Sequence, residues 1–316
     1  MGFHSNDVST SALAVSIEFA LRRQLLDARQ RAGIWGYEAG RMPRLEPTCW
    51  ALIALGTSRP GSSRVLAHWP SHEGALVEQH GGLVNWSFHA LALFTRLALG
   101  EASVSELRSI ATALVDARGI ALKPSSGQRQ DSDLHGWSWT DGTFGWLEPT
   151  AWALIALKKC RARGIVIEGA DKRIGDGEAI LQERACVTGG WNYGSSSLSG
   201  KDLPAYVPTT ALGLLALQDR GAEVCVRRSL NYLEEHAGKH RSTRGLALSV
   251  LALRRHGRST VRLKQELRRW LDQHPAADVA SIGMALSALE RSVPDTFALE
   301  PDSRGAPGRA CRPVVI

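Results

Sequence analysis

A short apolar pattern that recurs six times limits how this chain of 316 residues can fold. Two copies match at ten of eleven positions, 45–55 (LEPTCWALIAL) and 147–157 (LEPTAWALIAL). A helix that is apolar on every side has to be buried, so each copy predicts an interior helix. The six copies begin at Trp50, His89, Trp152, Leu212, Leu248 and Met284.

The segments between the copies have one charged and one apolar face. The copies begin 39, 63, 60, 36 and 36 residues apart, and a period of 36–39 holds two helices and two turns. The sequence therefore predicts an all-α fold of six helical hairpins. Because the interior helices are apolar on every side, we expect the hairpins to close into a ring. The amphipathic segments are 9–30, 103–118, 171–186, 224–236 and 260–273.

Composition predicts one domain over residues 1–293, followed by a flexible C-terminal tail, 294–316, that is rich in Pro, Gly and Arg and has no period. The five cysteines are widely spaced and odd in number, which indicates reduced thiols and a cytoplasmic location. The N-terminus lacks the pattern of a signal peptide, and no apolar run has the length of a transmembrane segment.

The net charge of +7 is local, because residues 221–270 hold 12 Lys and Arg against 4 Asp and Glu. Arginines suit a diphosphate, an anionic lipid or an acidic partner, but we interpret most of these as solvent-facing residues of outer helices. Nucleic acid is not an expected partner, since aromatic residues are scarce in this stretch. The stretch includes Arg227, Arg228, Arg241, Arg244, Arg254, Arg255, Arg258, Arg262, Arg268 and Arg269.

A Gln, Gly and Trp motif connects the chain to a known superfamily. Residues 182–194 read QERACVTGGWNYG, which resembles the Gln…Gly-x-Trp repeat of squalene cyclases and its counterpart in prenyltransferase β subunits. Over about residues 10–290 the chain resembles terpenoid cyclases and protein prenyltransferases, which implies an α6–α6 toroid with a central apolar cavity. Shorter copies lie at Gln30 with Gly33 and Trp35, at Gln79 with Gly81 and Gly82, and at Gly136 with Trp137.

The resemblance also implies a candidate acid. Class II cyclases carry Asp-x-Asp-Asp-Thr-Ala before an inner helix, and its middle Asp protonates the substrate. Residues 146–151 read WLEPTA, so Glu148 stands at that position, although Trp146 and Pro149 replace the flanking acids. Glu46 has the same place in the first copy, and we expect Glu46 and Asp141 to support Glu148.

The same residues also suit the start of a helix. Proline is favoured in the first helical turn, and the helix dipole there stabilises a carboxylate, which works against a proton donor. Glu46 and Glu148 are therefore either catalytic acids or ordinary helix-start residues.

Aromatic residues are the candidate wall of the cavity, because their faces stabilise a carbocation without reacting with it. The alternative is that the tryptophans cap hairpin junctions and that His89 is a hydrogen-bonded core residue. The predicted substrate-binding residues are Trp50, His89, Trp139, Trp146, Trp152, Trp191 and Tyr193.

No metal site or cofactor is predicted. Prenyltransferases use an Asp, Cys and His zinc site, and the nearest match, 278–281, has Ser281 where His is expected. Asp141 with Asp131 and Asp133 is only a weak candidate for a magnesium diphosphate.

The function that the resemblance implies is a terpenoid-cyclase-like or prenyltransferase-like protein acting on an isoprenoid in the central cavity. Squalene-type cyclases use two toroids, so a chain with one would use a protein partner or a homodimer, take a smaller substrate, or carry out different chemistry. The alternative is a non-catalytic toroid that binds a prenyl group or a protein partner.

Overall fold

The computed structural model describes residues 6–56, 62–78, 83–100, 102–120, 134–198, 201–290 and 295–299, leaving out the side chains of 6–16 and 62–64. The described residues are mostly helical, as predicted, and contain little strand. The α-helices are α1 (Asn6–Asp27), α2 (Leu45–Leu55), α3 (Trp86–Leu99), α4 (Val104–Asp116), α5 (Leu147–Ala162), α6 (Ala170–Glu183), α7 (Val207–Ala216), α8 (Val224–His236), α9 (Thr243–Arg255), α10 (Val261–Gln273) and α11 (Val279–Leu289).

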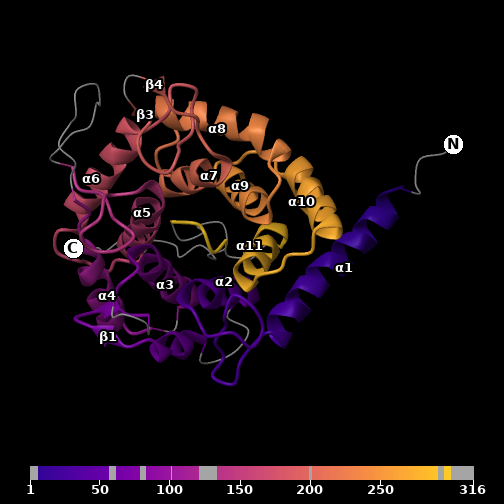
Figure 1. The fold of residues 1–316 in the computed structure, drawn as a ribbon, viewed down its shortest axis with the longest axis horizontal. Helices are drawn as coiled ribbons and strands as arrows, with labels where there is room; N and C mark the ends of the chain where they lie inside the picture. The colour runs from indigo at the N-terminus through magenta and orange to yellow at the C-terminus, as the bar shows by residue number, and fades with distance from the viewer. Residues whose placement is uncertain are drawn as a thin grey trace, which may run out of the picture.

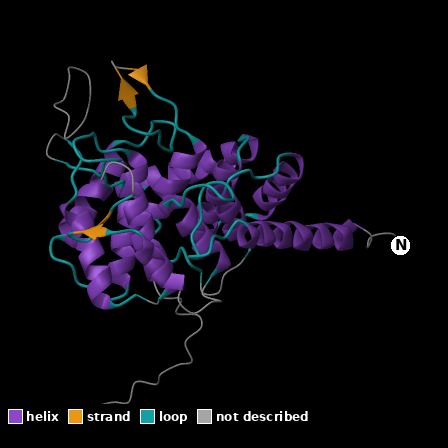
Figure 2. Ribbon diagram, turned by 60° about the horizontal axis from the view of Figure 1, so that its bottom comes forward, coloured by secondary structure: helices purple, strands orange, loops and turns teal. Residues whose placement is uncertain are grey.

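The remaining elements are short and lie in the connections (Figure 2). Two pairs of two-residue strands form antiparallel hairpins, β1 with β2 and β3 with β4. Between α2 and α3 the described connection holds a 3-10 helix in place of an outer α-helix. These elements are η1 (Ser62–His68), β1 (Ser71–His72), β2 (Ala75–Leu76), β3 (Ser197–Leu198), β4 (Lys201–Asp202) and η2 (Ala237–Lys239).

The six apolar copies lie in α2, α3, α5, α7, α9 and α11, and almost all of their residues are buried. Each of these helices packs against the next, and α11 packs against α2. The amphipathic helices α4, α6, α8 and α10 pack outside α3, α5, α7 and α9, as Figure 1 shows. The interior helices therefore screen one another from water, as their composition requires.

A tryptophan and a threonine bind each of three outer helices to the inner helix that follows. The Trp backbone N–H donates to the Thr Oγ1 over 2.9–3.1 Å, and the indole Nε1–H donates over 2.6–2.7 Å to a carbonyl of the preceding outer helix. We call each set a Trp–Thr clamp. The clamps are Trp35 with Thr48 and Leu25, Trp137 with Thr150 and Leu114, and Trp191 with Thr210 and Leu181.

The residue two positions after each clamp tryptophan bonds to another inner helix. The carbonyls of Trp139 and Tyr193 accept the N–H groups that begin α3 and α5, at 3.0 and 2.9 Å. The Tyr37 carbonyl accepts the N–H of Val279, which begins α11, at 2.8 Å. The pairs α11 and α2, α3 and α5, and α5 and α7 are therefore joined by the same kind of backbone hydrogen bond.

Part of the predicted C-terminal tail is described, and it is packed. In residues 295–299, Phe297 is 1% exposed and Leu299 is 7% exposed. The rest of 294–316 lies outside the described residues. At the other end of the chain, α1 packs on α10 and α11 and extends past the other helices (Figures 1 and 2).

Gly283 marks the closest approach of α11 to α2, and its substitution tests that contact. A Cβ at Gly283 would lie 2.7 Å from the carbonyl carbon and oxygen of Trp50. Alanine is favoured over glycine inside a helix by about 1 kcal/mol, but overpacking of this kind costs about 1–3 kcal/mol. We expect Gly283→Ala to lower the free energy of unfolding, measured by urea denaturation.

Gly175 of α6 is the matched control, because a Cβ there meets no atom within 4 Å. Gly175→Ala should stabilise the protein by about 0.5–1 kcal/mol. If both substitutions stabilise it alike, α11 and α2 are not in close contact.

Candidate functional site

Two predicted acids meet at the centre of the molecule, where the inner helices begin, and an arginine joins them. Arg244 of α9 donates from Nη1 to Glu46 Oε1 at 3.2 Å and from Nη2 to Glu148 Oε1. Glu46 begins α2 and Glu148 begins α5, and they are 6% and 7% exposed. We call these three residues the Glu–Arg–Glu group.

Tyr37 holds the second oxygen of Glu46. Its hydroxyl donates to Glu46 Oε2 at 2.5 Å. Burial, and then the charge of Glu46, raises the pKa of Tyr37 well above its ordinary value, so the phenol keeps its proton. Glu46 is therefore fixed by two donors, a phenol and a guanidinium.

Glu148 is subject to opposed influences. Burial raises the pKa of its carboxyl above the ordinary value, the Arg244 guanidinium acts in the opposite direction, and Glu46 adds to the increase. Two carboxylates share one guanidinium, so the ionised group carries a net charge of −1. A guanidinium in contact favours the charged form of an acid, whereas a proton donor to an alkene has to be neutral.

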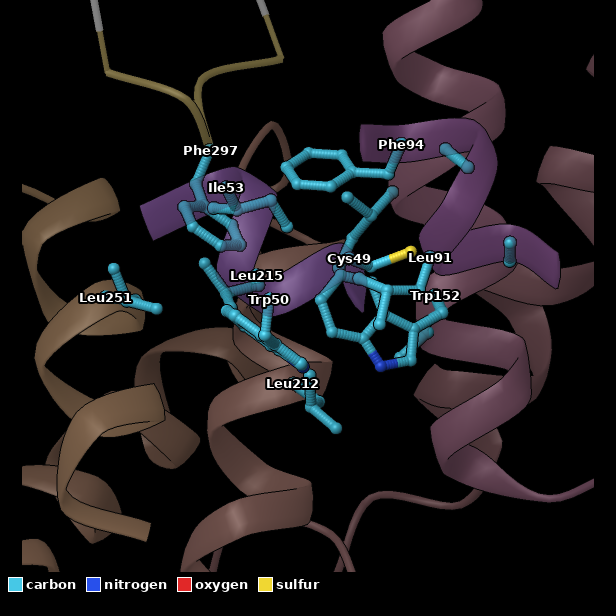
Figure 3. Packing of buried hydrophobic residues seen from close by; sticks show 14 of the residues in the cluster. Cys49, Trp50, Ile53, Leu91, Phe94, Trp152, Leu212, Leu215, Leu251 and Phe297 are labelled. Carbon is cyan, nitrogen blue, oxygen red and sulfur yellow. The ribbon is translucent and has the colours of Figure 1, made fainter. Parts of the chain in front are cut away.

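Aromatic side chains fill the centre beyond this group. Trp50 and Trp152 follow Glu46 and Glu148 by four residues, which places them on the same helix face, about 6 Å further along. Their rings meet edge to face with centroids 5.7 Å apart. Phe94 of α3 lies against Trp152 at 5.9 Å, so three inner helices contribute to one aromatic cluster (Figure 3).

A fourth ring in the cluster comes from outside the repeats. Phe297 stacks on Trp50 with centroids 6.0 Å apart and lies 5.1 Å from Phe94. Lys159, near the end of α5, donates to the carbonyls of Thr296 and Ala298 at 2.7 and 2.8 Å. Residues 295–299 therefore cover the end of the centre opposite the Glu–Arg–Glu group.

Of the predicted wall residues, Trp50 and Trp152 lie in this cluster. Trp191 is fully buried in a clamp, with its indole N–H on the Leu181 carbonyl. Trp139 and Trp146 are half-buried, each edge to face with a phenylalanine. Tyr193 is 48% exposed, and its ring lies 5.5 Å from that of Tyr206.

Asp141 does not belong to the Glu–Arg–Glu group. It is exposed, and its Oδ1 accepts the indole N–H of Trp86 at 2.7 Å, at the start of α3. Asp131 and Asp133, the weak magnesium candidates, lie outside the described residues, as do Gln79, Gly81 and Gly82. Asp141 is therefore placed to hold Trp86 rather than to support Glu148.

His89 does not face the centre. Its Nδ1 accepts the N–H of Leu76 at 3.2 Å, and its Nε2 lies 2.9 Å from the Ile110 carbonyl. A backbone N–H only donates and a carbonyl only accepts, so the ring is the neutral Nε2–H tautomer. Burial lowers the pKa of His89 to about 4. Both nitrogens are engaged by the protein and none is left for a ligand.

Arg244 is the residue that sequence reasoning missed, since it was assigned to a solvent-facing stretch. The repeat contained the signal: Arg244 precedes Leu248 by four residues, as Glu148 precedes Trp152. Arg254 and Arg255 were misassigned for the same reason, because both are largely buried and bound to Asp295. The position of Phe297 carried no such signal, since it lies outside the repeat.

Other features of the described part of the chain are limited. No group of three or more His, Cys, Asp or Glu side chains there is placed to hold a metal ion. None of its helices has the length and hydropathy needed to cross a bilayer. A cavity of about 170 Å³ opens near the starts of α2 and α3, lined by residues that include Arg44, Glu78 and Asn85.

Comparison with known proteins adds no family assignment. No protein-family model matches the chain, and no curated protein has significant similarity to it.

Substitution of Arg244 tests whether the two carboxylates are held as ions. In Arg244→Met, burial and the charge of Glu46 act on Glu148 without the opposing guanidinium and raise its pKa further, so the folded state binds more protons than the unfolded state. Stability then falls as pH rises through that pKa. We expect a loss of about 2–4 kcal/mol at pH 8 and a smaller loss at pH 5, measured by urea denaturation.

Arg41→Met is the control, because the Arg41 pair with Glu38 is largely exposed and should contribute less than about 1 kcal/mol. A deficit in Arg244→Met that is the same at both pH values would contradict the assignment.

His89 gives a second test by nuclear magnetic resonance. The ¹⁵N shifts of its ring should report the neutral Nε2–H tautomer from pH 5 to pH 8, because burial holds the pKa at about 4. The exposed His72 provides the reference signals. Titration of His89 near pH 6.5 would show that its ring is open to solvent or to a ligand.

Proposed function

We propose that the protein is an α/α toroid of six helical hairpins that binds an isoprenoid chain against its central aromatic cluster. The order of helix contacts, which runs from α2 through α11 and returns to α2, supports the toroid. The equivalent backbone bonds at Tyr37, Trp139 and Tyr193 also support it, because they repeat one junction around the molecule. η1 stands in the place of the outer helix of the second hairpin.

The observation that carries the ligand assignment is the gathering of Trp50, Phe94 and Trp152 between two charged ends. The rings are buried, and Phe297 packs on Trp50 and Phe94, so a chain without polar groups would gain a large apolar contact by taking its place. The proposal is a binding protein rather than a class II cyclase, because the Arg244 guanidinium contacts both Glu46 and Glu148, and such a contact works against proton donation by either acid. The four described free cysteines suit the reducing, cytoplasmic location that is part of the proposal.

A second candidate function is acid-initiated cyclisation, and one observation favours it. Burial raises the pKa of Glu148, and this acid stands one helical turn from Trp152 at the end of the aromatic cluster. In that case Arg244 would have to leave Glu148 before the carboxyl could carry the proton. A protein partner or a second copy of the chain would then complete the single toroid.

The binding proposal is tested by titrating the purified protein with squalene, farnesyl diphosphate and geranylgeranyl diphosphate and analysing the mixtures by mass spectrometry. We expect binding without cyclic or hydrolysed products. Trp152→Leu should weaken binding about tenfold, since aromatic contacts contribute about 0.5–1.5 kcal/mol beyond the area that they bury.

Trp270→Leu is the matched control, because Trp270 lies on the outer helix α10 against His274. Glu148→Gln should keep the binding. If the wild type forms a cyclic product and Glu148→Gln does not, the protein is a cyclase instead. If none of the three isoprenoids binds, both proposed functions are wrong.

A further inference from the structure

Residues 295–299 bring an apolar ring and an anionic group into one end of the molecule together. The Phe297 ring fills the space between Trp50 and Phe94, and Asp295 lies close to the surface of the same end. The segment reaches this place from outside the repeats, whereas the walls around it belong to α2, α3, α5, α7 and α9. It occupies the centre without being one of the helices that build it.

The polar contacts of the segment resemble those that an anionic head group would make. The Asp295 carboxylate meets Arg254 Nε at 3.5 Å and Arg255 Nη1 at 3.3 Å. The Lys159 ammonium donates to the Thr296 and Ala298 carbonyls. Gln218 adds a donated bond to the Phe297 carbonyl at 3.1 Å.

Among the described residues at this end, positive side chains outnumber carboxylates. Lys159, Arg254 and Arg255 face one carboxylate from the segment, Asp295, and Arg163 adds positive charge beside Lys159. Glu290 is close by, but it is paired with Arg22 at 2.6 Å. Burial lowers the pKa of Lys159 to about 8, so its ammonium is held at a cost that a nearby anion would reduce.

The packing around Phe297 is incomplete on one side. A cavity of about 30 Å³ lies between the segment and α2, α9 and α11, lined by residues that include Ile53, Arg254 and Phe297. A cavity of that size can hold water beside the ring.

We propose that this end of the centre is a binding site for an apolar chain with an anionic head, and that residues 295–299 are an internal occupant which the ligand displaces. The ring of Phe297 stands in for the chain, and the Asp295 carboxylate with the three carbonyls stands in for the head. The inference rests on the proposed function, that the centre receives an isoprenoid. It adds the end at which the ligand enters, opposite the Glu–Arg–Glu group, and the segment that regulates entry.

The test measures the affinity of full-length variants for farnesyl diphosphate, farnesol and inorganic pyrophosphate by calorimetry. Phe297→Ala removes the ring from the site and should bind farnesyl diphosphate about tenfold more tightly. In the wild type, only the fraction of molecules whose segment has left the site can bind, and the apparent affinity is lowered by that fraction. Leu271→Ala removes a buried side chain of the outer helix α10, away from the segment, and should leave the affinity unchanged. If the alanine variant does not fold, Phe297→Leu removes the ring with a smaller loss of side-chain volume.

A further variant tests the head group. In Phe297→Ala, replacing Lys159 with Met should reduce the preference for farnesyl diphosphate over farnesol about tenfold, since a charged hydrogen bond contributes about 1.5–3 kcal/mol. Hydrogen exchange gives an independent readout in the wild type. Farnesyl diphosphate should speed exchange of the Phe297 and Ala298 amides, which donate to Asp295 in the unliganded protein.

Three results would overturn the inference, and they are distinguishable. If the wild type binds farnesyl diphosphate but amide exchange at 297 and 298 is unchanged, and Phe297→Ala gains no affinity, the segment is not displaced by the ligand. The proposed function would still stand. No binding of any of the three probes by the wild type or by either Phe297 variant would remove both. Equal gains in Phe297→Ala and Leu271→Ala would show general loosening of the protein rather than a vacated site.

Discussion

The burial of six helices that have no polar face is the constraint on which the rest of this structure depends. A helix such as α5, with Trp152 to Leu157 buried all round, cannot rest on one neighbour, because the opposite side would remain in water. The packing of α11 against α2 removes the last exposed side. It brings the Gly283 backbone against Trp50, and the absence of a side chain at Gly283 permits that approach. Three of the outer helices, α1, α4 and α6, are then fastened by the Trp–Thr clamps.

The Glu–Arg–Glu group follows from that arrangement. Arg244 contacts acids that are 198 and 96 residues away in the chain, on helices that do not follow one another. The contacts exist only because α2, α5 and α9 begin at the same end of the molecule. Removing two carboxylates from water without a partner would be costly, so the group stabilises ions that the fold itself has buried. The charge at the opposite end has a similar origin, since Lys159, Arg254 and Arg255 all lie where inner helices finish.

An apolar, aromatic middle between two charged ends fits the proposed isoprenoid ligand. The acids are poor candidates for proton donors in this state, because Arg244 donates to both of them and Tyr37 donates to Glu46. Phe297 is of a different kind, because it adds a ring to the cluster from a segment that the repeat does not supply. As a displaceable occupant, Phe297 makes the centre a binding site, whereas a permanent core residue in that place would make it a closed hydrophobic interior.

The sequence by itself determined the helices and their alternation. The copies at 45–55 and 147–157 and the amphipathic segments between copies predicted inner and outer helices, because periodicity is a local property of the chain. It also placed Glu46 and Glu148 at equivalent helix starts. Only the tertiary structure decided what those acids meet, since Arg244 comes to them through the packing of distant helices. It also decided that His89 turns both nitrogens to backbone atoms, and that Phe297 enters the aromatic cluster. Such contacts depend on which side chains long-range packing brings within a few ångströms, and no local pattern encodes that.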